Sequence, residues 1–170
     1  MTGFRLMNKG LSAVGLTDRE VRHRIVTVSI PQGPRRGLLR RLFRLKAPDP
    51  GWRDYETAAA HFLRGLGFRS VESAGPGSDG GVDVRVPGVL VGQVKAHKAK
   101  VGRPPLQQIF GIASEEGVEA IFFSKAGYTK TATEWADKSG IGLFVVNYSG
   151  EDFVVRTANR SATRLGPNRY

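Results

Sequence analysis

Residues 78–98, SDGGVDVRVPGVLVGQVKAHK, predict two neighbouring strands joined by a tight turn. In the first strand Val82, Val84 and Val86 alternate with small or polar residues, which is the pattern of a strand with one buried face. Asp83 is therefore expected to leave the sheet on the face opposite the valines. This strand pair constrains the fold more than any other segment, because it requires a sheet and determines which polar side chains can meet.

The length of the turn decides whether Asp83 meets the polar residues of the second strand. Gln93 and Lys95 are two residues apart in that strand, so they share one face. A two-residue loop would place Asp83 opposite Gly92, and Gln93 and Lys95 would then lie on the other face. A three-residue loop over residues 87–89, or a bulge, pairs Asp83 with Gln93 and brings the polar side chains together. We predict this longer connection.

A carboxylate, an amide oxygen and an ammonium group that meet on one face suit phosphoryl chemistry. Oxygen atoms are the ligands that Mg²⁺ prefers, and a nearby cation stabilises the negative charge that develops on a phosphate. The strand pair therefore indicates a site that binds a divalent metal ion and hydrolyses a phosphate ester.

The composition favours a polyanionic partner, because the 170 residues carry a formal net charge of +11 and the sequence pI is about 10.6. The chain contains no cysteine, which excludes disulfides, zinc thiolate sites and thiol nucleophiles. No apolar run approaches the length of a membrane span, and the first residues lack the apolar core of a signal peptide. We therefore expect a cytoplasmic protein.

The charge is unevenly distributed and suggests three segments. Residues 1–50 contain 11 Lys/Arg and 3 Asp/Glu, residues 51–150 contain 11 and 10, and residues 151–170 contain 4 and 2. We predict a basic N-terminal extension, a nearly neutral cored domain and a basic C-terminal tail with one short element over these three ranges. The sequence APDPG at residues 47–51 is typical of a linker at the first boundary.

Residues 35–46, RRGLLRRLFRLK, predict a basic amphipathic helix within the N-terminal extension. Such a helix can dock on its own domain, bind across DNA phosphates or lie on an anionic membrane surface, and the sequence leaves the three alternatives open. Before it, residues 17–20 have the form of a capping box, and residues 25–30, IVTVSI, predict a strand.

The domain over residues 51–150 is expected to alternate helices with strands. Helices are predicted at residues 52–66, 104–117 and 129–138, and further strands at residues 68–73, 119–124 and 141–147. The expected core face of the second helix consists of Leu106, Ile109, Phe110 and Ala113. The order predicts an α/β fold with an αβββαβ core, in which helices pack on the faces of a mixed central sheet.

Three short segments follow one another in this domain: GGVDV at residues 80–84, GQVK at residues 92–95 and LQQIFG at residues 106–111. In this order and spacing they resemble the Mrr-type restriction endonucleases, a branch of the PD-(D/E)xK nuclease superfamily. The resemblance extends over residues 52–150 and implies a restriction-endonuclease-like fold. It also implies that Asp83 binds metal, that Gln93 replaces the more usual glutamate of the superfamily and that Lys95 is the catalytic lysine.

Glu56 is the candidate for a further metal ligand, because the neutral amide of Gln93 binds a divalent cation more weakly than a carboxylate does. It lies one position from Tyr55, at the edge of the buried stripe of the first helix. The resemblance implies that a glutamate on this helix reaches the metal site. The alternative is a surface glutamate near a helix start, where the helix dipole stabilises it.

The basic loop after the strand pair contains the candidate DNA-binding residues. Lys98, Lys100 and Arg103 can hold phosphates that flank the site, which would position DNA without reading its sequence. Exposed loops also carry such charges for solubility alone. The glycine-rich residues 74–81 are interpreted as a turn that leads into the first strand of the pair, since no Gly-Lys-Ser/Thr sequence and no helix follow them.

These observations and the resemblance together predict a metal-dependent DNA endonuclease that uses Mg²⁺ or Mn²⁺. The resemblance further implies restriction of foreign DNA, as a type IV-like enzyme. Cleavage of both strands of a duplex needs two sites, so a homodimer is expected. Two alternatives stay open: a DNA-binding module with a nuclease fold and little cleavage, and a membrane-surface or protein adaptor that uses residues 35–46.

Overall fold

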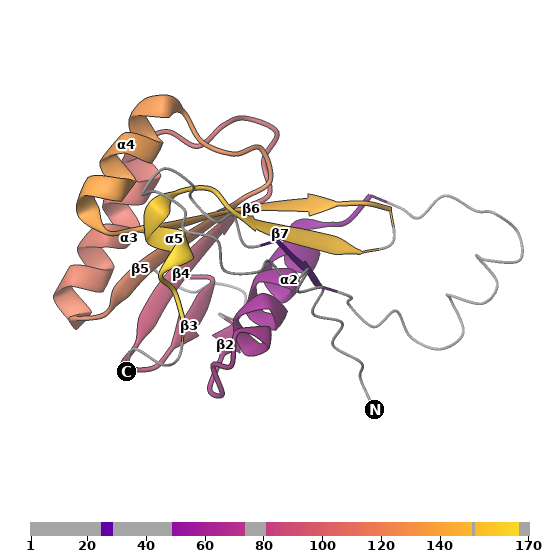
Figure 1. Cartoon of the computed structure of the whole chain (residues 1–170), viewed down its shortest axis with the longest axis horizontal. Helices are drawn as coiled ribbons and strands as arrows, with labels where there is room; N and C mark the ends of the chain where they lie inside the picture. The colour runs from indigo at the N-terminus through magenta and orange to yellow at the C-terminus, as the bar shows by residue number, and fades with distance from the viewer. Residues whose placement is uncertain (1–24, 29–48, 74–80, 151, 167–170) are drawn as a thin grey trace, which may run out of the picture.

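The computed structural model describes residues 25–28, 49–73, 81–150 and 152–166, which form one mixed sheet with helices packed on it (Figure 1). In this part of the chain seven strands lie in the order β1-β7-β6-β5-β4-β3-β2. The strands are β1 (Ile25–Val28), β2 (Glu72–Ser73), β3 (Val84–Val86), β4 (Leu90–Lys95), β5 (Glu119–Ser124), β6 (Gly142–Tyr148) and β7 (Phe153–Thr157). The helices are α2 (Trp52–Gly65), α3 (Arg103–Glu116), α4 (Lys130–Ser139) and α5 (Arg160–Thr163).

The sheet is buried on both faces at its centre, where β4, β5 and β6 run parallel. On one face α2 inserts Phe62, which contacts Phe123 and Phe144 with ring centroids 6.0 and 5.1 Å away. On the other face α3 and α4 pack side by side (Figure 1), with Leu106 and Ala136 in a second core. The succession α2, β2, β3, β4, α3, β5 confirms the predicted αβββαβ core and the α/β class.

The connection between β3 and β4 has the predicted odd length. Val84 pairs with Gly92 and Val86 pairs with Leu90, so that three residues, 87–89, separate the strands. The amide of Val89 donates to the carbonyl of Val86 at 2.9 Å, and Gly88 has a φ of +69°, as the third residue of a type II turn requires. Continued by one residue, this register puts Asp83 level with Gln93, although the regular pairing ends at Val84.

The strand predicted at residues 68–73 is shorter than expected, because β2 contains only Glu72–Ser73. The apolar residues that suggested the longer strand, Phe68 and Val71, are buried in the core with α2. The guanidinium of Arg64 donates to the carbonyl of Val71 at 2.8 Å. The carbonyl of Val71 therefore has its hydrogen bond from the Arg64 side chain and does not need a partner on a neighbouring strand.

Two side chains depart from the predicted core pattern. Val84 and Val86 lie in the core with α2, whereas Val82 lies in the core with α3 and α4, so the expectation that the three valines share a face is wrong for Val82. The chain turns at Gly81, which has a φ of +78°, and regular alternation begins only at β3. Phe110 is 36 % exposed rather than buried, and its ring contacts Trp135 of α4 at 5.7 Å.

The residues after Gly150 form two elements, a strand and a short helix, so the prediction of one short element is wrong. Alternate residues of β7, Phe153, Val155 and Thr157, are buried, and this strand pairs antiparallel with β6. Asn159 then caps the N-terminus of α5, with its side-chain Oδ1 accepting from the amide of Ala162 at 3.0 Å. The basic, low-complexity composition of residues 151–170 conceals a period of two that extends over only five residues.

The predicted N-terminal strand is present as β1, which pairs antiparallel with β7. The strands β1, before residue 50, and β7, after residue 150, thus lie in the same sheet as the elements between them. The division of the chain into three segments stays a prediction. The capping box at residues 17–20, the amphipathic segment at residues 35–46 and most of the glycine-rich turn lie outside the described residues. None of the described helices has the length and apolarity to cross a membrane.

Candidate active site

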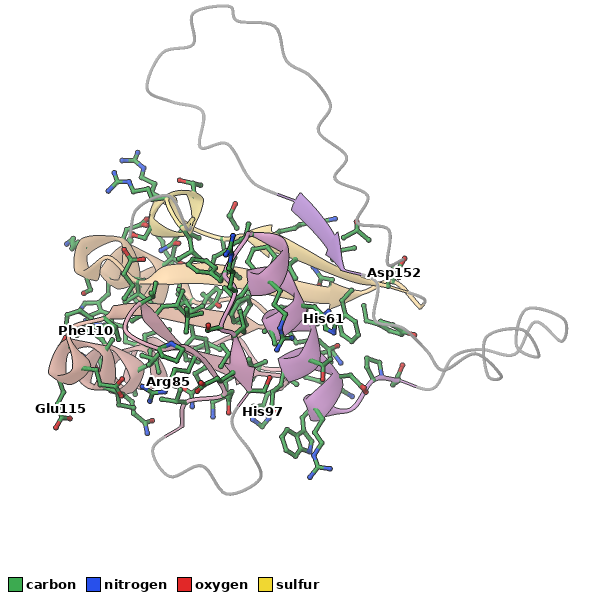
Figure 2. The ribbon with its side chains drawn as sticks, turned by 90° about the horizontal axis from the view of Figure 1, so that it is seen from below. His61, Arg85, His97, Phe110, Glu115 and Asp152 are labelled. Carbon is green, nitrogen blue, oxygen red and sulfur yellow. The ribbon has the colours of Figure 1, made fainter. Side chains whose placement is uncertain are left out.

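A pocket of about 350 Å³ opens where β4 ends, between that strand and the first turn of α2. It is lined by Pro50, Trp52, Glu56, Asp83, Gln93, Val94, Lys95, Ala96 and His97. Figure 2 shows His97 beside the start of α2. The four residues predicted to do chemistry, Glu56, Asp83, Gln93 and Lys95, all line this one pocket although they come from three separate elements.

Helix α2 positions Glu56 at the pocket because its neighbours Tyr55, Ala59 and Phe62 are buried against the sheet. Glu56 itself is half-buried at the edge of that stripe. Burial raises the pKa of the Glu56 carboxyl above its ordinary value, the charge of Asp83 raises it further, and the charge of Arg53 lowers it. The two carboxylates therefore lie close enough to repel each other.

Asp83 is held by the backbone of the neighbouring strand. Its amide donates to the carbonyl of Gly92 at 2.8 Å, and its carboxylate accepts from the amide of Val94 at 2.6 Å. Burial raises the pKa of Asp83, against the hydrogen bond from Val94 and the charge of Lys95, which both lower it. The net result is a carboxylate that is fixed in place and still costly to ionise, which a bound cation would relieve.

Gln93 is the buried member of the group, with 7 % of its surface exposed. Its Oε1 is the one buried side-chain oxygen or nitrogen in the described residues that lacks a hydrogen-bond partner. A Cβ at Gly81 would lie 2.8 Å from its Nε2, so the glycine leaves the space that the amide occupies. A buried acceptor without a donor costs about 1–3 kcal/mol, which a bound metal ion would offset.

The oxygen donors at the pocket fit Mg²⁺ or Mn²⁺. Glu56 and Asp83 supply carboxylates and Gln93 supplies an amide oxygen, all of them hard ligands. The described residues contain no group of three or more histidine, cysteine, aspartate or glutamate side chains that could hold a metal. The available donors are thus two carboxylates and an amide, and the compensation of Gln93 by Glu56 stays a prediction.

Two lysines lie at the carboxyl ends of adjacent parallel strands. Lys95 ends β4 and lines the pocket, and the amide of Lys125, just after β5, donates to the carbonyl of Lys95 at 3.0 Å. The ammonium group of Lys125 lies over the ring of Tyr55 at 5.3 Å. Our sequence reasoning missed Lys125, although a lysine directly after a buried strand in a parallel arrangement is a signal for this edge of the sheet.

None of the predicted DNA-binding residues lines the pocket. Lys98 and Lys100 are exposed in the loop after β4, and Arg103 begins α3 with its guanidinium 5.6 Å from the centre of the Trp135 ring. His97, which the sequence suggested to be incidental, lines the pocket instead, as does the unpredicted Trp52. The arrangement thus has a charged floor and a rim that contains two aromatic rings.

The comparison with protein families agrees with this arrangement. Residues 49–154 match the model of the family Mrr_cat, described as restriction endonuclease, and the match covers more than half of the chain. It includes every residue that lines the pocket. Neither the curated proteins nor the solved structures gave a match. The chain therefore belongs to the Mrr_cat family of restriction endonucleases.

Proposed function

We propose that this protein is a metal-dependent DNA endonuclease whose active site is the pocket at the end of β4. The observation that carries the proposal is the unpartnered Oε1 of Gln93, which is buried beside two carboxylates whose pKa values are raised. Such a group of oxygens is unfavourable by itself and becomes favourable around a divalent cation. Family membership supports phosphodiester hydrolysis as the reaction.

In this mechanism Asp83, Gln93 and Glu56 hold Mg²⁺ or Mn²⁺. The ion, when bound, polarises the scissile phosphate and lowers the pKa of a water molecule. Asp83 keeps its orientation through the amide of Val94, so that its second oxygen is available to a ligand. Lys95 extends from the end of the same strand as Gln93 and stabilises the negative charge that develops on the phosphate oxygens.

Residues around the pocket supply the electrostatic attraction for DNA. Lys98 and Lys100 are exposed in the loop that follows the pocket strand and bind flanking phosphates. Two copies of the site cut the two strands of a duplex, so the active form is a homodimer. The biological role is restriction of foreign DNA in the cytoplasm, as in type IV-like systems.

The test is cleavage of supercoiled plasmid by the wild type and by Lys95→Ala, with Mg²⁺, Mn²⁺ or EDTA. Methylated and unmethylated plasmids are compared, so that a methylation requirement is detected. Lys138→Ala is the matched control, since this exposed lysine is in the last turn of α4 and does not line the pocket. We expect metal-dependent nicking or linearisation by the wild type and the control, and none by Lys95→Ala.

Two outcomes would contradict the proposal. Cleavage by Lys95→Ala at the wild-type rate would remove Lys95 from the catalytic group. Tight DNA binding by the wild type without cleavage in either metal would instead favour a DNA-binding module with a nuclease fold. Calorimetry with Mn²⁺ then decides whether the oxygens at Glu56, Asp83 and Gln93 bind metal at all.

A further inference from the structure

Trp52 has a position that phosphodiester chemistry alone does not explain. It is 55 % exposed, more than any other large apolar side chain in the described residues, and it lines the active-site pocket. An indole ring in water loses the free energy that its burial would provide, so an exposed tryptophan at a pocket points to a ligand that covers it.

The helix brings Trp52 to the same pocket as Glu56, one of the proposed metal ligands. Trp52 and Glu56 are four residues apart in α2, so they lie on the same side of the helix, one turn from each other. A phosphate held by the floor of the pocket would therefore have the indole within reach of the nucleoside attached to it. Pro50 and His97 border the same rim, and Figure 2 shows His97 beside the first turn of α2.

One face of the indole already has a partner. The guanidinium of Arg53 lies 5.0 Å from the centre of the Trp52 ring, which is cation–π geometry. This contact orients the ring and leaves its other face for a second flat group. A nucleobase is such a group, and bases stack on aromatic side chains regardless of their sequence.

We propose that Trp52 stacks on the nucleobase next to the scissile phosphate, so that the enzyme cuts a strand or duplex faster where this base is unpaired than where it is paired. The inference rests on the proposed function and specifies its substrate. In an intact duplex both faces of a base are covered by its neighbours, and unstacking a paired base costs a few kcal/mol. Single-stranded, mismatched or frayed DNA avoids that cost.

The other exposed aromatic group does not compete for this role. Trp135 of α4 contacts the ring of Phe110 and the guanidinium of Arg103, both from α3. None of the three lines the pocket. A base stacked there would not be the base beside the scissile phosphate.

The chain offers a direct spectroscopic test, because Trp52 and Trp135 are its two tryptophans. In the double variant Trp135→Phe/Lys95→Ala, Trp52 is the single indole and the DNA stays intact. A single-stranded oligonucleotide should quench the Trp52 fluorescence in the presence of Mg²⁺. The matching duplex and an oligonucleotide of abasic sites should quench it much less.

Affinity and cleavage provide the second readout. With Lys95→Ala as the parent, Trp52→Ala should weaken binding of the single strand by about 5- to 150-fold, the range of one base–aromatic stack. Trp52→Phe should retain most of the affinity, and Trp52→Leu, which is apolar without a π face, should not. In the protein with Lys95, Trp52→Ala should lower the rate on single-stranded and mismatched DNA far more than on duplex DNA.

The outcomes separate this inference from the proposed function. If the wild type cuts DNA while Trp52 fluorescence stays constant at saturation and Trp52→Ala cuts every substrate at the wild-type rate, the inference is wrong and the nuclease assignment stands. If the wild type neither binds nor cuts any nucleic acid, both are wrong. Quenching that follows protein concentration without DNA would assign Trp52 to self-association and overturn the inference.

Discussion

Gly92→Ala tests how closely β4 must approach its neighbours for the pocket to form. Gly92 directly precedes Gln93 and is paired with Val84 on β3. A Cβ at this position would lie 2.7 Å from Cγ1 of Ile121 and 2.8 Å from Cγ2 of Val84. Carbon atoms prefer separations of about 3.5–4.0 Å, so both contacts would be too short by roughly 1 Å.

The residues around the added Cβ cannot move away easily, and this determines how much stability the substitution costs. Val84 and Ile121 are fully buried in the core with α2, and both are β-branched, so their χ1 angles are restricted. Overpacking of this kind costs about 1–3 kcal/mol of unfolding free energy. For a chain of this size, a cost of about 2 kcal/mol lowers the melting temperature by roughly 4–8 °C.

Urea unfolding of the wild type, Gly92→Ala and Gly111→Ala measures the effect. Gly111 is the matched control because it is an exposed residue in α3 whose added Cβ would meet nothing within 4 Å. Alanine there should stabilise the protein by about 0.5–1 kcal/mol. The two substitutions thus have opposite expected signs. Equal stability of Gly92→Ala and the wild type would refute the reasoning from close packing.

Three further predictions concern the pocket and the core behind it. Asp83→Asn should abolish the increase in melting temperature on Mg²⁺ addition, while Glu115→Gln, exposed on α3, should keep it. Because the pKa of Asp83 is raised, the folded state binds its proton more tightly than the unfolded state does, so stability falls as pH rises through that pKa. Without metal, Asp83→Asn should therefore have a higher free energy of unfolding than the wild type at neutral pH, and this difference should vanish in acid. A difference that does not change with pH would show that ionisation of Asp83 is not its cause. Gln93→Leu should raise the free energy of unfolding without metal by about 1–2 kcal/mol and abolish cleavage, because it removes the unpartnered oxygen. A loss of stability in urea unfolding would show instead that the amide has a structural role. Tyr128→Phe should lower the free energy of unfolding by about 1 kcal/mol and leave cleavage unchanged, because the Tyr128 hydroxyl lies 2.8 Å from the carbonyls of Phe122 and Phe144. An unchanged melting temperature would show that these hydrogen bonds do not stabilise the fold.

The part of the site that lies within one strand pair could be derived from the sequence. Asp83, Gln93 and Lys95 are within thirteen residues of one another, and the alternation of the strands and a Pro-Gly turn fix their register. Local geometry therefore determines which of these side chains meet. The role of Glu56 was implied only by the family resemblance, because the periodicity of α2 does not indicate which edge of the sheet the helix will cover.

Residues that other elements bring to this edge of the sheet could not be derived in this way. Trp52 and Lys125 depend on how α2 docks against the ends of β4 and β5, which is a tertiary property. Phe110 fits the apolar stripe of α3, yet it lies outside the core, 36 % exposed with its ring against Trp135 of α4. Helical periodicity identifies a face, but it does not show how far the neighbouring helix extends across it.

The pairing of β1 with β7 has a consequence for the order of folding. Ile25 lies opposite Arg156, so this ladder joins the two ends of the described chain, whereas the β3–β4 hairpin closes over three residues. The entropy lost on closing a loop grows with its length, so the hairpin can form before the chain has collapsed and the terminal ladder must wait until the rest of the sheet exists. We therefore expect the segment that carries Asp83, Gln93 and Lys95 to form early, and the outer strand β1 to join the sheet last.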